Sequence, residues 1–152
     1  MRLFLKVKCL GIQLLIKSLL SFVQGCLRKN VKNAKNNSSL LNGIWTPVKQ
    51  EMAGQDLPSI VFEKYKLTMT DSLYTYGSYD TDHGVTTYAD GKMDIYGKGG
   101  VNAGKHFTAI YTYENLQLTI CYNLKGDSYP EAFETTSKPM LFLSVFKNGL
   151  QK

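Results

Sequence analysis

After residue 42, hydrophobic and polar residues alternate in short segments, which is the period-two pattern of β-strands. Residues 61–70 show this pattern well. Four apolar side chains share one face, with Glu63 as the exception: Val61, Tyr65, Leu67 and Met69. The other face is polar: Lys64, Lys66, Thr68 and Thr70. This alternation predicts a strand with one buried face and one solvated face.

The clearest hairpin joins residues 106–113 to residues 115–122. One apolar face belongs to the first segment: Phe107, Ala109, Tyr111 and Tyr113. The second segment has a matching face: Leu116, Leu118, Ile120 and Tyr122. Because Glu114-Asn115 leaves room only for a tight turn, the two segments are predicted to pair as antiparallel strands.

Turn signals separate nine predicted strands at short intervals. These strands lie near residues 43–49, 61–70, 72–78, 84–89, 92–97, 106–113, 115–122, 131–136 and 139–147. Gly54 and Pro58 interrupt residues 50–58, for which a loop or short helix is expected. Many short strands are typical of an all-β barrel or sandwich, so the sequence predicts one antiparallel β domain over residues 43–152.

Net charge affects this picture only through its distribution. The 152 residues carry a formal charge of +6, which alone would favour a nucleic-acid partner. Eight positive residues and no acidic ones precede Gly43, whereas the rest of the chain holds ten Lys against twelve Asp and Glu. The predicted β domain therefore has a net charge of about −2 and no basic binding face, and nucleic-acid binding is not expected.

The N-terminal residues have the order of a secretory signal over residues 1–25: a short basic start, an apolar stretch from Leu10 to Val23, and a small residue before Cys26. Residues 23–26 resemble the lipobox of bacterial lipoproteins, which implies cleavage before Cys26 and lipidation of its thiol. Gln24 departs from the usual Ala or Ser, and Lys17 interrupts the apolar stretch. An uncleaved membrane anchor and an amphipathic helix packed on the barrel are the alternatives.

Residues 26–42 are rich in Lys, Asn and Ser and are predicted to form a flexible, basic tether. With a lipid anchor, the protein would be attached to the cell envelope. Leu27-Arg28-Lys29-Asn30 is basic and lacks an acidic export signal, which favours the periplasmic side.

The chain contains three Cys residues. Processing at Cys26 would remove Cys9 and leave Cys121 as the one free thiol, so no disulfide could form within the mature chain. Without lipidation, a bridge between Cys26 and Cys121 is the alternative. Cys121 shares a strand face with Gln117 and Thr119, and it has no basic neighbour in sequence, so a packed residue is favoured over a catalytic thiol.

Several short motifs together resemble a small lipocalin-like family of extracytoplasmic bacterial proteins, abundant in planctomycetes and without an assigned reaction. The matching residues are Gly43-x-Trp45, Glu51, Gly54, Leu57-Pro58, Lys92-Met93-Asp94-Ile95, Gly104-Lys105, Ala109-Ile110-Tyr111, Leu118-Thr119-Ile120-Cys121, Pro130, Phe133 and Leu141-Phe142-Leu143. The resemblance covers roughly 105 of the 152 residues, from Gly43 to Lys147. Tyr129 stands where the family usually has Arg.

The resemblance implies a closed barrel of about eight strands. Gly43 and Trp45 would close its floor, with Lys147 as a cation-π partner of the indole. A barrel of this size either holds one small ligand or is filled by its own side chains, and the sequence does not decide between them.

Two polar motifs are candidates for chemistry. Residues 99–105 fit the G-x4-G-K spacing of a phosphate loop, but His106 follows instead of Ser or Thr, so a glycine-rich hairpin loop at the barrel mouth is favoured. Asp80-Thr81-Asp82-His83 could attract a cation, yet the twelfth position of a calcium loop is Gly91 instead of Glu. A solvated turn is favoured, and neither a metal nor another cofactor is expected.

Three functions remain open. The leading hypothesis is a binding protein for a small apolar or amphipathic molecule, with a pocket wall of Tyr74, Tyr76, Tyr111 and Tyr113. The alternative is a filled barrel that contacts an envelope protein through loops 79–84 and 97–105, for example as an inhibitor. An enzyme is the third, and it requires Asp82, His83 and His106 to meet in space.

Overall fold

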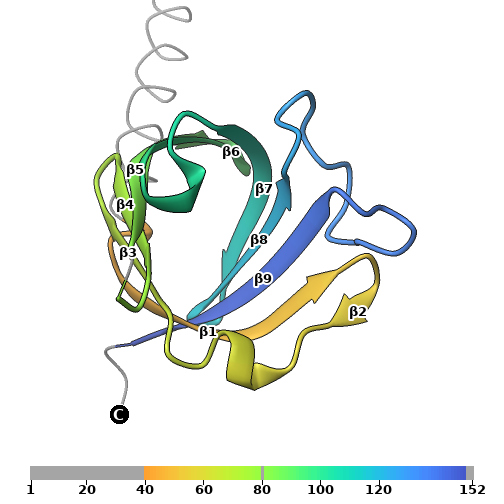
Figure 1. The fold of residues 1–152 in the computed structure, drawn as a ribbon, viewed down its shortest axis with the longest axis horizontal. Helices are drawn as coiled ribbons and strands as arrows, with labels where there is room; N and C mark the ends of the chain where they lie inside the picture. The colour runs from red at the N-terminus through yellow and green to blue at the C-terminus, as the bar shows by residue number, and fades with distance from the viewer. Residues whose placement is uncertain (1–39, 80, 150–152) are drawn as a thin grey trace, which may run out of the picture. The chain divides into compact units, whose positions relative to one another are not determined.

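The protein folds as a closed antiparallel β-barrel in a computed structural model that describes residues 40–79 and 81–149 (Figure 1). The strands are β1 (Gly43–Met52), β2 (Gln55–Asp56), β3 (Lys66–Thr70), β4 (Leu73–Gly77), β5 (Asp82–Ala89), β6 (Lys92–Gly99), β7 (His106–Glu114), β8 (Gln117–Asn123) and β9 (Leu141–Asn148). Two short 3₁₀ turns are η1 (Ser59–Val61) and η2 (Gly100–Asn102).

Closure of the barrel depends on β1, which pairs with both β3 and β9. The strands from β3 to β9 pair in chain order, and the two-residue β2 adds to the edge of β1 alone. The barrel proper therefore has eight strands, which confirms the predicted all-β antiparallel barrel of about eight strands.

The predicted β7–β8 hairpin is present, with Glu114 paired to Gln117. The two turn residues are Asn115 and Leu116, and both have positive φ angles, 51° and 63°. This is the left-handed pair that a two-residue hairpin turn requires. Leu116, expected to face the core from a strand, is instead in the turn and is 44% exposed.

Other element boundaries differ from the prediction. The strand expected from residue 61 begins at Lys66, because η1 and a turn precede it. Residues 50–58 are not a simple loop: β1 continues to Met52 and forms a tight hairpin with β2. Ala53 and Gly54 make its turn, with φ angles of 53° and 78°.

The strand predicted at residues 131–136 is wrong, because this segment is a loop held by side-chain hydrogen bonds. The fully buried hydroxyl of Thr135 accepts the Gly54 amide proton at 2.8 Å and donates to Glu51 Oε1. These bonds draw the segment onto the β1–β2 hairpin and away from any strand ladder.

One end of the barrel is filled by side chains. Trp45, Leu118 and Ala109 are fully buried there, and Leu41 is 1% exposed. The Trp45 indole N–H donates to the Leu41 carbonyl at 2.9 Å. Leu41 therefore belongs to the folded domain, although the sequence placed it in the tether.

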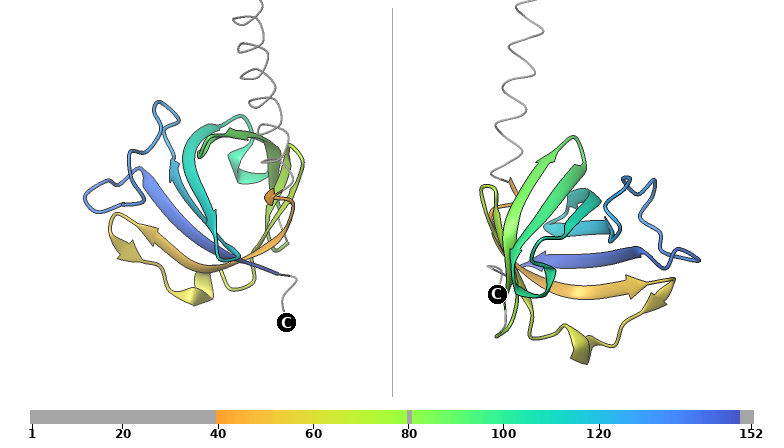
Figure 2. Two further views of the ribbon diagram at one scale, coloured as in Figure 1. Left: turned by 180° about the vertical axis from the view of Figure 1, so that it is seen from behind. Right: turned by 45° about the horizontal axis from the view of Figure 1, so that its top comes forward.

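The other end is wider because β1 leaves β3 early. The two strands pair only from Gly43 to Trp45, and beyond a bulge at Pro47 to Lys49, β1 pairs with β9 and the short β2 but no longer with β3 (Figure 2). The buried Gln50 side chain spans the opened seam. Its Nε2 donates to Tyr76 Oη at 2.6 Å and to Ser144 Oγ at 3.2 Å.

Candidate functional site: an apolar cavity in the barrel

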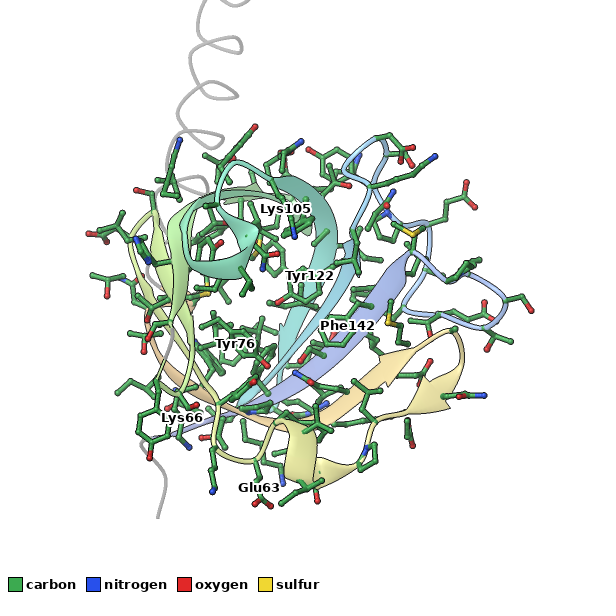
Figure 3. All side chains as sticks on the ribbon, in the orientation of Figure 1. Glu63, Lys66, Tyr76, Lys105, Tyr122 and Phe142 are labelled. Carbon is green, nitrogen blue, oxygen red and sulfur yellow. The ribbon has the colours of Figure 1, made fainter. Side chains whose placement is uncertain are left out.

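The wide half of the barrel contains a cavity of about 550 Å³. Strands β3 to β9, η2 and the loop before β9 supply its wall. The apolar lining residues are Leu67, Met69, Met93, Ile95, Phe107, Ile120, Leu124, Met140, Phe142 and Phe146. Figure 3 shows Tyr76, Tyr122 and Phe142 around the interior and Lys105 beside the opening. The arrangement is an apolar pocket with a polar margin, which suits a small ligand.

Two of the four tyrosines predicted to bind ligand line this cavity: Tyr74 and Tyr76. Tyr122 lines it as well, a residue that the strand alternation placed on the inner face but to which no function was assigned. Burial raises the pKa of all three phenols, and the nearby Asp82 raises that of Tyr74 further. These tyrosines therefore stay neutral and offer the cavity aromatic faces with hydroxyl groups.

Tyr111 and Tyr113 do not line the cavity, because they lie in the filled half. Tyr113 packs edge-on against Trp45, with 5.5 Å between ring centroids, and Tyr111 packs in the same way against Tyr88 at 6.0 Å. The shear of the barrel carries these β7 positions towards its closed end. Their predicted place in a pocket wall is therefore corrected, while ligand binding by Tyr74 and Tyr76 remains a prediction.

Of the residues predicted to close the floor, Trp45 lies inside the barrel and Lys147 does not. Trp45 points inward and pairs in register with Asn148, whereas Lys147 is exposed between the inward-facing Phe146 and Asn148. The two-residue period of a strand thus puts Lys147 on the outer face, away from the indole. Gly43 has φ of 141°, and a Cβ at this position would meet open space, so backbone conformation explains the glycine.

The β6–β7 connection bends over the cavity mouth and is pinned there by Asp82. Asp82 is 7% exposed, and its carboxylate accepts hydrogen bonds from the Asn102 backbone N–H at 3.3 Å and from Asn102 Nδ2 at 3.1 Å. Lys105 Nζ donates to Asn102 Oδ1 at 3.2 Å. A side chain at Gly97 would place its Cβ 1.9 Å from the Asn102 carbonyl oxygen, so glycine is required for this fold-over. A strand follows the loop, as predicted.

The three residues of the enzyme hypothesis do not meet. Asp82 faces the cavity, whereas the next residue, His83, is exposed on the outside of β5. His106 Nε2 lies 2.9 Å from Asp94 Oδ1 on the outer face of β6 and β7. Tyr129 donates to Asp94 Oδ2 at 2.6 Å, and this bond, followed by that of His106, lowers the pKa of Asp94.

The described residues of the polar turn, Asp82 and His83, do not converge on a common point. Asp80 lies outside the described residues, and Asp82 and His83 point to opposite sides of the barrel wall. Within residues 40–79 and 81–149, no three His, Cys, Asp or Glu residues are grouped to hold a metal ion.

Cys121 is a free thiol that is fully buried on the outer side of β8, where burial raises its pKa. This agrees with a packed residue. The proposed lipidation site, Cys26, and the signal segment lie outside the described residues. No helix in the described part of the chain is long and apolar enough to cross a membrane.

No family model and no curated protein matches this chain. Among solved structures, the chain is similar to an uncharacterized protein from Bacteroides eggerthii, with 11% sequence identity over 71% of this chain and 98% of that chain. The TM-score is 0.48. Such a likeness carries no statement about a ligand or a reaction.

Proposed function

We propose that this protein is an envelope-tethered, lipocalin-like binding protein for one small apolar or amphipathic molecule. The observation that carries the proposal is the cavity of about 550 Å³ with a mainly apolar wall. An empty apolar cavity forfeits contacts that a ligand would restore. Burial of apolar ligand surface would contribute roughly 25 cal/mol per Å².

The mouth gives an amphipathic ligand a direction. Asn102 and Lys105 supply polar groups at the margin, while Phe107, Ile95 and Met93 lie within. Apolar parts of a ligand would therefore lie against these inner side chains, and any polar substituent at the mouth would meet Asn102 and Lys105. The cellular location remains a proposal from the sequence: a lipid on Cys26 would attach the protein to the membrane on its periplasmic side.

The direct test is a titration of the full chain with N-phenyl-1-naphthylamine, whose fluorescence rises in an apolar environment. We expect saturable binding at one site. Ile95→Phe replaces an aliphatic side chain of the cavity wall with a larger aromatic ring and should weaken this binding. Thr87→Phe, on the exposed face of β5, should not. Absence of saturable binding to the folded wild-type chain would count against the proposal.

A protein-interaction role is the second candidate. Tyr79 is 96% exposed and Val101 75% exposed, and they belong to the two loops predicted as a contact surface. The interior is not filled, so this role would coexist with an open cavity. A double change, Tyr79→Ser with Val101→Ser, should abolish recovery of an envelope partner by crosslinking and leave N-phenyl-1-naphthylamine binding unchanged. Retention of the same crosslinked partner would exclude these loops as its contact.

A further inference from the structure

The inner face of β5 differs from the rest of the cavity wall. Asp82 and Thr86 line the cavity from this strand, and Gly84 lies between them. The Tyr74 ring covers Gly84, since a Cβ there would be 2.9 Å from Tyr74 Cε1. Tyr74 Oη then donates to Asp82 Oδ2 at 3.3 Å. A polar strip therefore runs along one side of an apolar pocket.

Thr86 is the unexplained member of this strip. Its side chain is 2% exposed, and its Oγ1 has no hydrogen-bond partner among the described residues. A buried hydroxyl without a partner is unfavourable, and such groups in native structures are few. Rotation about χ1 to another staggered rotamer moves Oγ1 to a different side of Cβ, so the hydroxyl can turn towards a ligand in the cavity that offers the missing partner.

Asp82 limits the kind of group that belongs beside this strip. It forms no ion pair with any described residue, and its three donors, on Tyr74 and Asn102, are neutral. Lys105, the cation that lines the cavity, is at the mouth and donates to Asn102 Oδ1 instead. An anionic ligand group near this carboxylate would be repelled in a site of low dielectric. A neutral hydroxyl has no such penalty, and it can both donate to and accept from Thr86.

We infer that the ligand is an alcohol or a phenol: an apolar molecule whose neutral hydroxyl group is hydrogen-bonded to Thr86 inside the barrel. This inference rests on the proposed function, because it names the class of molecule that the cavity selects. It makes Thr86 a specificity-determining residue, whereas the apolar wall supplies affinity without discrimination.

The test compares three probes that share one ring system: naphthalene, 2-naphthol and 2-naphthoate, titrated into the full chain at pH 7 by calorimetry. Thr86→Val removes the hydroxyl and keeps the shape of the side chain. Thr87→Val is the matched control, since it makes the same change on the exposed face of the same strand. Thr86→Ser, which retains a hydroxyl, is the rescue variant.

Wild-type protein should bind 2-naphthol about tenfold more tightly than naphthalene, as one additional hydrogen bond allows, and 2-naphthoate most weakly. Thr86→Val should abolish the preference for 2-naphthol without changing the dissociation constant of naphthalene. Thr87→Val and Thr86→Ser should keep the preference. The melting temperature of unliganded Thr86→Val should rise by a few degrees, because a buried hydroxyl without a partner is removed.

Equal affinities of wild type for naphthalene and 2-naphthol would overturn the inference, as would tighter binding of 2-naphthoate or an unchanged preference in Thr86→Val. If Thr86→Val does not fold, the wild-type order of the three probes and the behaviour of Thr86→Ser still decide the matter. Failure of the proposed function looks different: the wild-type chain would bind none of the three probes, nor N-phenyl-1-naphthylamine.

Discussion

The two halves of the barrel are built by the same strands and packed in opposite ways. In the closed half, Trp45, Ala109 and Leu118 leave no solvent-accessible surface, whereas the open half keeps a cavity of about 550 Å³. On β7, Ala109 belongs to the filled region and Phe107, two residues earlier, lines the cavity. The alternation of side chains thus shows which residues point into the barrel, but it does not show whether side chains fill the interior.

The difference has an energetic meaning. Side chains in the closed half are surrounded by other atoms, as in most protein interiors. Those around the cavity lack partners on one side and lose the corresponding dispersion energy. The closed half should therefore supply stability and the open half should supply ligand binding. Comparable substitutions made in each half test this division.

The largest effect is expected from Trp45→Ala. Removal of a fully buried indole leaves a void in the closed half and removes the hydrogen bond to the Leu41 carbonyl. We expect the free energy of unfolding to fall by about 3–5 kcal/mol, as measured by denaturant titration. Phe142→Ala is the comparison in the open half, where the ring is only partly buried. An equal loss for both variants would contradict the division.

Enlargement of side chains tests the same comparison in the other direction. Ala109→Leu adds atoms where none fit, so it should lower the free energy of unfolding by about 1–3 kcal/mol. Ile95→Phe adds a ring beside empty space and should cost less than about 1 kcal/mol while it weakens ligand binding. If Ile95→Phe proved the more damaging change, the cavity would not be present in solution.

The pattern of the sequence predicted the strands of the closed half better than the places of its individual side chains. The strands, the β7–β8 hairpin and the inward Trp45 all follow from alternation and turn residues, which are local signals. Lys147 was misplaced because its assignment came from a resemblance, whereas counting two residues per repeat from the inward Phe146 puts it outside. Leu116 was misplaced because an apolar residue is an unusual choice for a left-handed turn position.

The open half could be predicted only in part, because it depends on distances between strands. Tyr74 and Tyr76 were found from alternation, but the early separation of β1 from β3 has no local signal. The loop at residues 131–136 resembles a strand in sequence, and only Thr135 bonding to Glu51 and Gly54 decides its path. The hydrogen bonds between Asp82 and Asn102 could not be predicted, because the sequence does not show which way the glycine-rich loop folds.

Ionisation of the cavity tyrosines provides the next comparison. Burial raises the pKa of Tyr122 above its ordinary value of 10.0, so the unfolded chain releases this proton first as pH rises. The raised pKa contributes to the free energy of unfolding. This contribution is fully present below pH 10 and is lost as the pH rises above 10, by up to about 1.4 kcal/mol per pH unit for each such tyrosine. Tyr122→Phe should therefore lose less stability than wild type between pH 10 and 11. Parallel stability curves would contradict this expectation.

The smallest effect concerns the opened seam beside β1, which the Gln50 side chain spans. Tyr76→Phe removes the 2.6 Å bond from Gln50 Nε2 but leaves the bond to Ser144, so the free energy of unfolding should fall by about 1 kcal/mol. Tyr65→Phe removes a hydroxyl from the ring that packs edge-on against Tyr76 and is the matched control. Amide hydrogen exchange should quicken in β3 and β4 only in Tyr76→Phe, because Gln50 there replaces the strand ladder that β1 abandons. Unchanged exchange in both variants would mean that packing by η1 and Tyr65 closes the seam without this polar bridge.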